Sequence, residues 1–361
     1  MSDYDAGRVW DLLRQASSLP HGEVQVRLTE EAVNLAETGR DLDLMFAARQ
    51  KLVGNAVYSG RLEKALPAFA WCLSHLEREP ERFSRYKFHL LWEFKNILHN
   101  VDEFPQLSKD QISALRDQMA NLYRQSGYNM RPVHYTSLTF AMRSGHFAEA
   151  AESFAKYREL GRDSMADCLA CEADSDAEYY MLVGENEQAV EAGGPTLRRQ
   201  LICTEVPHRT YCNMLRPLAL QGRYEEADEY QRKGYRLVRN KVIFLAHLGW
   251  QLAYQAHRDR LSSALRMFEV NLGIALDTFN LRSRYLFFLA ARRVLALAAE
   301  KKTSQKLNLP QSFPLYSSTE NYDLAELLNW IDAENARVAA QFDARNGNVY
   351  HSQDLAQFVN Y

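Results

Sequence analysis

Cysteine is scarce in this sequence, with five residues in 361. So few thiols, odd in number, exclude a small scaffold held together by disulfide bonds. Glycine and proline are also modest, at 16 and 10 residues, which excludes collagen-like and low-complexity chains. With 47% hydrophobic and 25% charged residues, the composition is that of a folded globular protein.

Long hydrophobic runs are missing as well. The most apolar stretch, residues 285–299, is interrupted by Arg292 and Arg293 and falls short of the roughly 20 apolar residues that a bilayer requires. The N-terminus is polar and acidic, without the basic start and apolar core of a signal peptide. We therefore expect a cytoplasmic protein that does not contact a membrane.

The sequence also lacks the strong signatures of enzymes. It contains no Gly-x-Gly-x-x-Gly, no Gly-x-x-x-x-Gly-Lys-Ser/Thr, no His-Glu-x-x-His and no Gly-x-Ser-x-Gly motif. We expect a protein that is not an enzyme. The alternative is an unfamiliar hydrolytic site built from acids and histidine, such as Asp174, Glu178 and His208.

The hydrophobic pattern of the sequence is mainly that of helices. Apolar residues recur at spacings of three and four in nearly every window, so we predict an all-α fold. The clearest helices are expected over residues 8–16, 23–36, 42–58, 62–76, 282–299 and 323–345. These patterns predict four regions along the chain. They are N-terminal helices (1–41), a repeat region (42–300), an exposed loop (301–322) and a C-terminal capping helix with a ragged tail (323–361).

A short pattern returns along the repeat region: a glycine, an alanine five residues later and often an aromatic residue after that. It occurs at Gly60/Ala65/Phe69, Gly145/Ala150/Phe154, Gly184/Ala189, Gly222/Ala227/Tyr230 and, with Asp for Gly, Asp259/Ala264/Phe268. Glycine can end a helix in the left-handed conformation, and alanine permits the close crossing of two helices. Repeated helix pairs of this kind bury their apolar faces by stacking into a solenoid, the alternative being an irregular helical bundle.

This pattern resembles the tetratricopeptide repeat (TPR), although the spacing of 37 to 39 residues between the later units exceeds the family's usual 34. The resemblance implies a right-handed solenoid of helix pairs whose concave face binds a peptide or a partner protein. It covers roughly residues 42–272, and the tryptophan and Leu-Gly usual in the family's first helix are mostly missing.

Charge is unevenly distributed despite a net charge of only −3. Residues 196–306 hold 20 Lys+Arg and 9 Asp+Glu, a net of +11, so the remainder carries −14. If first helices line the concave face, Arg209 and Arg216 would form a basic stripe there. The preceding units would add Tyr135, Arg143, Asp174 and Glu178. Such a face would suit an acidic peptide, whereas the alternative is an ordinary solvated surface. Nucleic acid is not expected as a partner.

Four residues have the types and spacing of a metal site. Cys168 and Cys171 form a Cys-x-x-Cys pair, and Cys203 and His208 follow about one repeat later. In the repeat model both pairs lie in turns on the same edge of the solenoid, where three thiolates and one imidazole could hold a structural zinc ion. The alternative is that these residues pack in helical cores and that no cofactor is bound.

These observations lead to a functional expectation. The chain is expected to be a non-catalytic scaffold or adaptor that binds a protein or peptide on its concave face. The alternative is a regulatory protein whose superhelix changes shape when it binds a ligand or peptide. The oligomeric state does not follow from the sequence.

Overall fold

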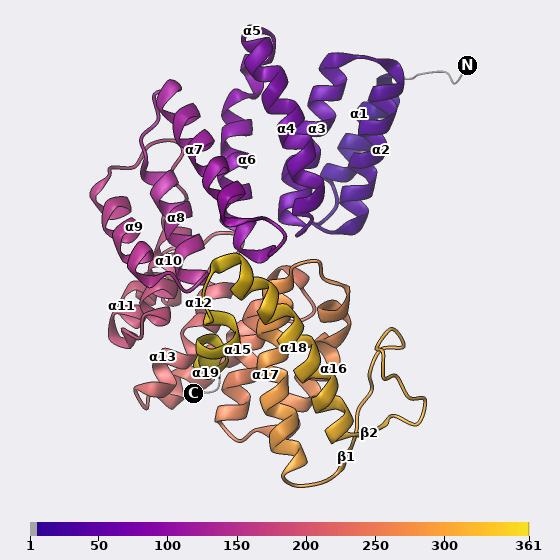
Figure 1. Cartoon of the computed structure of the whole chain (residues 1–361), viewed down its shortest axis with the longest axis vertical. Coiled ribbons are helices and arrows are strands. Elements are labelled where there is room, and N and C mark those ends of the chain that lie inside the picture. The colour runs from indigo at the N-terminus through magenta and orange to yellow at the C-terminus, as the bar shows by residue number, and fades with distance from the viewer. Residues whose placement is uncertain (1–5, 360) are drawn as a thin grey trace. The chain divides into compact units, whose positions relative to one another are not determined.

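The computed structural model describes residues 6–359 and 361 and confirms the all-α class. Within that described part, the strands are limited to one short antiparallel pair, β1 (Ser304–Lys306) and β2 (Asn321–Asp323) (Figure 1). The helices are α1 (Ala6–Ser17), α2 (Glu23–Gly39), α3 (Leu42–Tyr58), α4 (Leu62–Arg78), α5 (Pro80–Phe83), α6 (Lys87–Asn100), α7 (Lys109–Gln125), α8 (Arg131–Arg143), α9 (Phe147–Glu159), α10 (Leu169–Leu182), α11 (Asn186–Leu197), α12 (His208–Asn213), α13 (Leu215–Leu220), α14 (Tyr224–Val238), α15 (Leu245–His257), α16 (Leu261–Asp277), α17 (Leu281–Ala299), α18 (Leu324–Asn346) and α19 (Leu355–Val359). Short helical turns connect several of them, among them a π-turn over Tyr350–Asp354.

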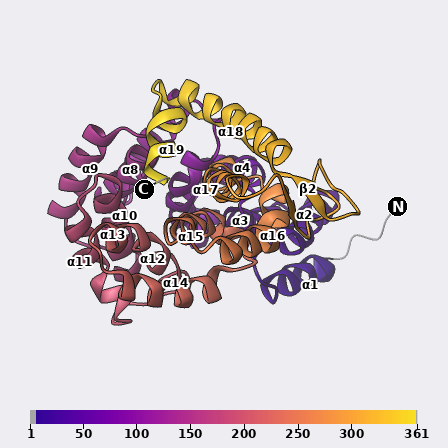
Figure 2. The same cartoon turned by 90° about the horizontal axis from the view of Figure 1, so that it is seen from below.

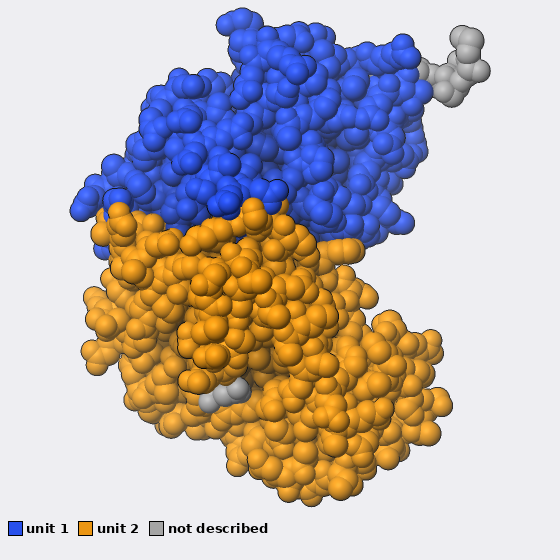
Figure 3. Space-filling view, viewed as in Figure 1, with its two compact units in different colours: residues 1–102, 110–137, 156–165 blue, residues 103–109, 138–155, 166–361 orange. Residues whose placement is uncertain are grey.

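The chain forms two compact units (Figure 3). Unit 1 comprises residues 1–102, 110–137 and 156–165, and unit 2 comprises residues 103–109, 138–155 and 166–361. In unit 1, α1 to α4 each pack against the next helix, and α6 packs on α3 and α4. In unit 2, α10 packs on α11, α15 on α16, and α16 on α17. Packing between chain neighbours is that of a solenoid.

The glycine-and-alanine pattern marks the turns within the helix pairs. Gly60, Gly145, Gly184 and Gly222 all have φ between 69° and 85°, and Asp259, in the equivalent place, has φ 57°. After each turn, the next backbone N–H bonds back to a carbonyl five residues earlier, which is the Schellman arrangement that ends a helix. The alanines of the pattern are fully buried: Ala65, Ala150, Ala189, Ala227 and Ala264.

Unit 2 has an inner layer of helices, α10, α12, α13, α15 and α17, each in contact with the next member or the one after it. The second helices α11, α14 and α16 cover this layer. The approach of α15 to α17 depends on Gly249, since a Cβ there would lie 2.8 Å from the backbone oxygen of Leu286. α18 and α19 pack on this layer through α17. We call the surface of the layer that they contact, as distinct from the one covered by α11, α14 and α16, the inner face (Figure 2).

Two expectations for the C-terminal region need correction. The loop over residues 301–322 is only partly exposed, because Phe313 is buried and its ring meets Trp330 of α18 edge-on. The last residues form a π-turn and α19, with Leu355 and Val359 fully buried, instead of a ragged tail. The missed signal is local, because Leu355 and Val359 have helical spacing.

Candidate functional site

A cluster of charged side chains joins three helices of unit 2. Glu178 of α10 accepts two hydrogen bonds from Arg143 of α8, at 2.9 Å from Nε and 2.7 Å from Nη2. Arg209 of α12 places its Nε 2.9 Å from Asp174 Oδ2 and its Nη2 3.9 Å from Glu178 Oε2. Because Asp174 and Glu178 are four residues apart, they share one face of α10. Four of the six residues predicted to bind a partner therefore lie together.

Burial makes this cluster strongly interacting. The Asp174 side chain is fully buried, and those of Glu178, Arg143 and Arg209 are 10%, 13% and 17% exposed. Burial by itself opposes ionisation of Glu178, but the charges and hydrogen bonds of Arg143, with help from Arg209, lower its pKa to about 2. For Asp174, burial outweighs Arg209 and raises the pKa, and the Thr210 hydroxyl donates to Asp174 Oδ1 at 2.6 Å.

His247 of α15 completes the surroundings of the cluster. Its ring is partly exposed, but Nδ1 is buried and has no hydrogen-bond partner within the described chain. Burial, together with the nearby positive charges of Arg209, Arg143 and Arg282, lowers the pKa of His247 to about 3. The imidazole is therefore neutral near pH 7.

The two arginines of the predicted basic stripe have different partners in the structure. Arg209 and Arg216 lie on separate short helices, α12 and α13, which meet at Met214. Arg209 is paired with acids of its own chain, whereas Arg216 contacts the C-terminal segment described below. Tyr135 belongs to unit 1 and is only 4% exposed, with its ring against His99 and Tyr157, so it is a core residue.

The end of the chain lies on the inner face of unit 2. We call residues 350–359 and 361 the C-terminal segment. Arg216 Nε donates to the Phe358 backbone oxygen at 3.2 Å, and its guanidinium stacks 3.8 Å from the centre of the Phe358 ring. Arg293 of α17 donates to the Tyr361 backbone oxygen at 2.7 Å. Trp250 of α15 meets the Phe358 ring edge-on.

The other end of this segment is equally well held. The Tyr285 hydroxyl of α17 donates to the His351 backbone oxygen. Tyr350 is buried and packs over the turn between α8 and α9, beside Gly145 and Phe147. The C-terminal segment therefore contacts the inner face through backbone oxygens and aromatic rings.

Gly145 provides a test of this contact. We expect Gly145→Ala to lower the free energy of unfolding by about 1–2 kcal/mol more than Gly184→Ala does, measured by urea denaturation. Both glycines have positive φ, 78° and 85°, so both substitutions strain the turn. An added Cβ at Gly145 would also overlap the Tyr350 ring, whereas one at Gly184 meets nothing within 4 Å. Equal effects of the two substitutions would argue against a packed Tyr350.

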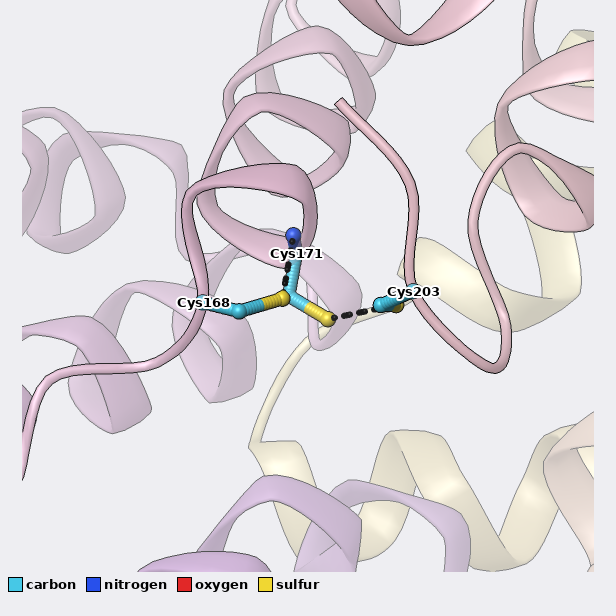
Figure 4. A group of neighbouring side chains, drawn as sticks. All are labelled: Cys168, Cys171 and Cys203. Carbon is cyan, nitrogen blue, oxygen red and sulfur yellow. Dashed lines mark hydrogen bonds between the residues drawn. The ribbon is translucent and has the colours of Figure 1, made fainter. Parts of the chain in front are cut away.

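A second candidate site is formed by three cysteines (Figure 4). Cys168 is the N-cap of α10, Cys171 lies in the first turn of that helix, and Cys203 lies in the connection between α11 and α12. The three Sγ atoms are all within 4.8 Å of one another. Among the described residues these thiols form the one group with metal-binding spacing.

His208, the fourth predicted ligand, is not part of this group. It begins α12, and its ring is stacked on Phe244 at 5.4 Å between ring centres. The sequence spacing from Cys203 is short enough for a metal ligand, but the start of α12 turns the imidazole toward Phe244. The structure therefore joins three of the four residues.

The thiols differ in their surroundings. Cys168 is exposed, while Cys171 and Cys203 are partly buried. Burial raises the pKa of the Cys171 thiol, and the positive charge of Arg209 acts in the opposite direction. In the absence of a bound cation, Cys171 is thus a neutral thiol near pH 7.

Comparisons with known proteins place the chain in no family: no protein-family model matches it, and a search of curated proteins returns no significant match. Among the described residues, the helices are too short or too polar to cross a membrane.

Proposed function

We propose that this chain is a non-catalytic binding protein, of the kind implied by its TPR-like pattern, and that the inner face of unit 2 receives a peptide segment of a partner protein. The observation that carries the proposal is the position of the C-terminal segment on this face. Here Arg216 and Arg293 donate to backbone oxygens, and Trp250 contacts an aromatic ring. These are contacts that any extended or helical peptide with a suitably spaced aromatic residue can make.

The chemistry of this face favours a peptide with aromatic side chains over a purely acidic one. Arg143 and Arg209 are largely occupied by Glu178 and Asp174, so much of the local positive charge is neutralised within the protein. Arg216 instead combines a hydrogen bond with a stacked ring. A guanidinium used in this way recognises a backbone oxygen and an aromatic face together.

Binding of a synthetic peptide with the sequence of residues 348–361 tests the proposal. We expect the full-length double variant Phe358→Ala/Tyr361→Ala to bind this labelled peptide at least about 10-fold more tightly than the unmodified protein, because the weakened segment competes less. Fluorescence anisotropy measures the affinity. Gln357→Ala alters an exposed residue of the same segment and should behave as the unmodified protein.

Charge reversal at Arg209 is a poor probe of this face, because it would break the buried ion pairs. Arg216→Ala in the double variant is the sharper choice, and it should weaken peptide binding while the circular dichroism spectrum stays helical. A folded double variant that binds no peptide would contradict the proposal.

A regulatory function is the second candidate, and the same segment favours it. A partner that binds the inner face must displace the C-terminal segment, which changes the surface that the protein exposes. In a regulator, adding the peptide should make the C-terminal segment sensitive to protease. In a static scaffold, protease sensitivity should not change.

A further inference from the structure

Three thiols of unit 2 converge, two from the start of α10 and one from the connection between α11 and α12. Cys168 closes the connection that leads into α10, and Cys171 follows one helical turn later. Cys203 comes from the connection between α11 and α12, where its backbone N–H is bonded to the Val206 oxygen at 2.9 Å. Residues 32 positions apart thus present sulfur atoms to one another.

The distances fit a metal ion better than a disulfide bond. The Sγ atoms of Cys171 and Cys203 are 3.4 Å apart, and all three Sγ atoms lie within 4.8 Å. Tetrahedral zinc with Zn–S bonds of about 2.3 Å requires sulfur atoms about 3.8 Å apart. This distance lies between the 3.4 Å of the Cys171–Cys203 pair and the 4.8 Å that bounds the whole group. A disulfide would require a separation of about 2.0 Å.

The surroundings also suit a cluster of thiolates. Cys168 Sγ accepts the backbone N–H of Cys171 at 3.4 Å, at the N-terminus of the 14-residue helix α10. This end of a helix carries partial positive charge. The guanidinium of Arg209 acts electrostatically on Cys171. Three thiolates and one divalent cation leave a net charge of −1. The N-terminus of α10 and the Arg209 guanidinium both stabilise this negative charge.

We propose that Cys168, Cys171 and Cys203 bind one Zn²⁺ ion, with water in the fourth coordination position. Binding replaces the three thiol protons by the metal and releases them to solvent. Water has access because Cys168 is exposed. The ion joins the connection before α10 to the connection before α12, and thereby fixes the start of both helices that carry Asp174 and Arg209.

Cobalt substitution tests the site directly. The reduced, metal-free, full-length protein is titrated with Co²⁺, whose bonds to thiolates give a charge-transfer absorption in the near ultraviolet. We expect this band to saturate at one ion per chain and to disappear when Zn²⁺ is added. Thermal unfolding should then occur at a higher temperature with Zn²⁺ than with a chelator, because the ion binds the folded state. A protein that gives no such band would overturn the proposal.

Cys168→Ser is the decisive variant, because the side chain is exposed and its loss should leave the fold intact. We expect it to lower the affinity for Zn²⁺ by at least about 100-fold, since loss of even an outer-sphere partner costs 10- to 100-fold. Cys171→Ser and Cys203→Ser should act similarly. Cys72→Ala and Cys212→Ala, at buried thiols outside the group, should retain full binding. Unchanged affinity in Cys168→Ser would overturn the assignment.

Discussion

Replacing Glu178 with alanine is expected to lower the free energy of unfolding by about 3–5 kcal/mol, the largest effect of any substitution considered for this protein. Glu178 accepts two hydrogen bonds from Arg143 and lies near Arg209, and its side chain is only 10% exposed. Without this carboxylate, Arg143 and Arg209 would both lose a neighbouring negative charge in a buried place. Urea denaturation followed by circular dichroism measures the loss.

Two further variants distinguish the effect of losing the Glu178 charge on stability from the effect of substituting any glutamate. Glu187→Ala removes an exposed carboxylate at the start of the neighbouring helix α11 and should change stability by less than about 0.5 kcal/mol. The double variant Arg143→Met/Glu178→Leu removes both charges of the buried pair and should be more stable than Glu178→Ala alone, which removes only one of them. If Glu178→Ala cost as little as Glu187→Ala, the buried ion pair would be refuted.

Acidification below about pH 6.5 is expected to destabilise the protein through His247. Burial and the neighbouring guanidinium groups lower the pKa of His247 to about 3, from about 6.5 for a free imidazole. The unfolded chain therefore binds a proton at this residue that the folded chain rejects, so stability falls as the pH decreases below 6.5. At pH 4, His247 alone should account for about 3 kcal/mol.

His247→Gln isolates this contribution, since glutamine has no titrating group. Between pH 7 and pH 4 the variant should lose about 3 kcal/mol less than the unmodified protein. Burial also lowers the pKa values of His146, His208 and His351, so part of the acid sensitivity should remain in the variant. The depressed pKa of Glu178, about 2, means that its own stabilising contribution is lost only as the pH falls from 4.5 through 2. Identical pH profiles for the two proteins would contradict a His247 imidazole that stays neutral in the folded protein.

Local signals predicted the helix pairs well. The expected helix over residues 42–58 matches α3 at both ends, because Asp41 caps the first turn and Gly60 adopts positive φ after the last. The alanines five residues after each such turn are fully buried, as close helix crossing requires. Caps, turns and small residues act over a few positions, so one sequence is enough to recognise them.

The contacts between the inner face and the C-terminal segment were harder to predict because they join residues far apart in the sequence. The contact between Arg216 and Phe358 spans 142 positions, and no periodicity links the two. The basic stripe stays a prediction, but the partners of its two members could not be read from local spacing: Arg209 pairs with Asp174, whereas Arg216 contacts Phe358. The thiols were placed correctly near one another, whereas the direction of the His208 ring depends on its packing against Phe244.

If the inner face receives a peptide as proposed, the attachment of the C-terminal segment to α18 determines the affinity that a competing partner needs. Only Gly347, Asn348 and Val349 separate α18 from the π-turn that begins at Tyr350, so this tether is short. A segment held in this way acts at an effective concentration on the order of millimolar. A free peptide with the same intrinsic affinity must reach that concentration to occupy half of the molecules. A partner present at micromolar levels therefore needs roughly 1,000-fold higher affinity than the segment, or a second contact elsewhere on the protein.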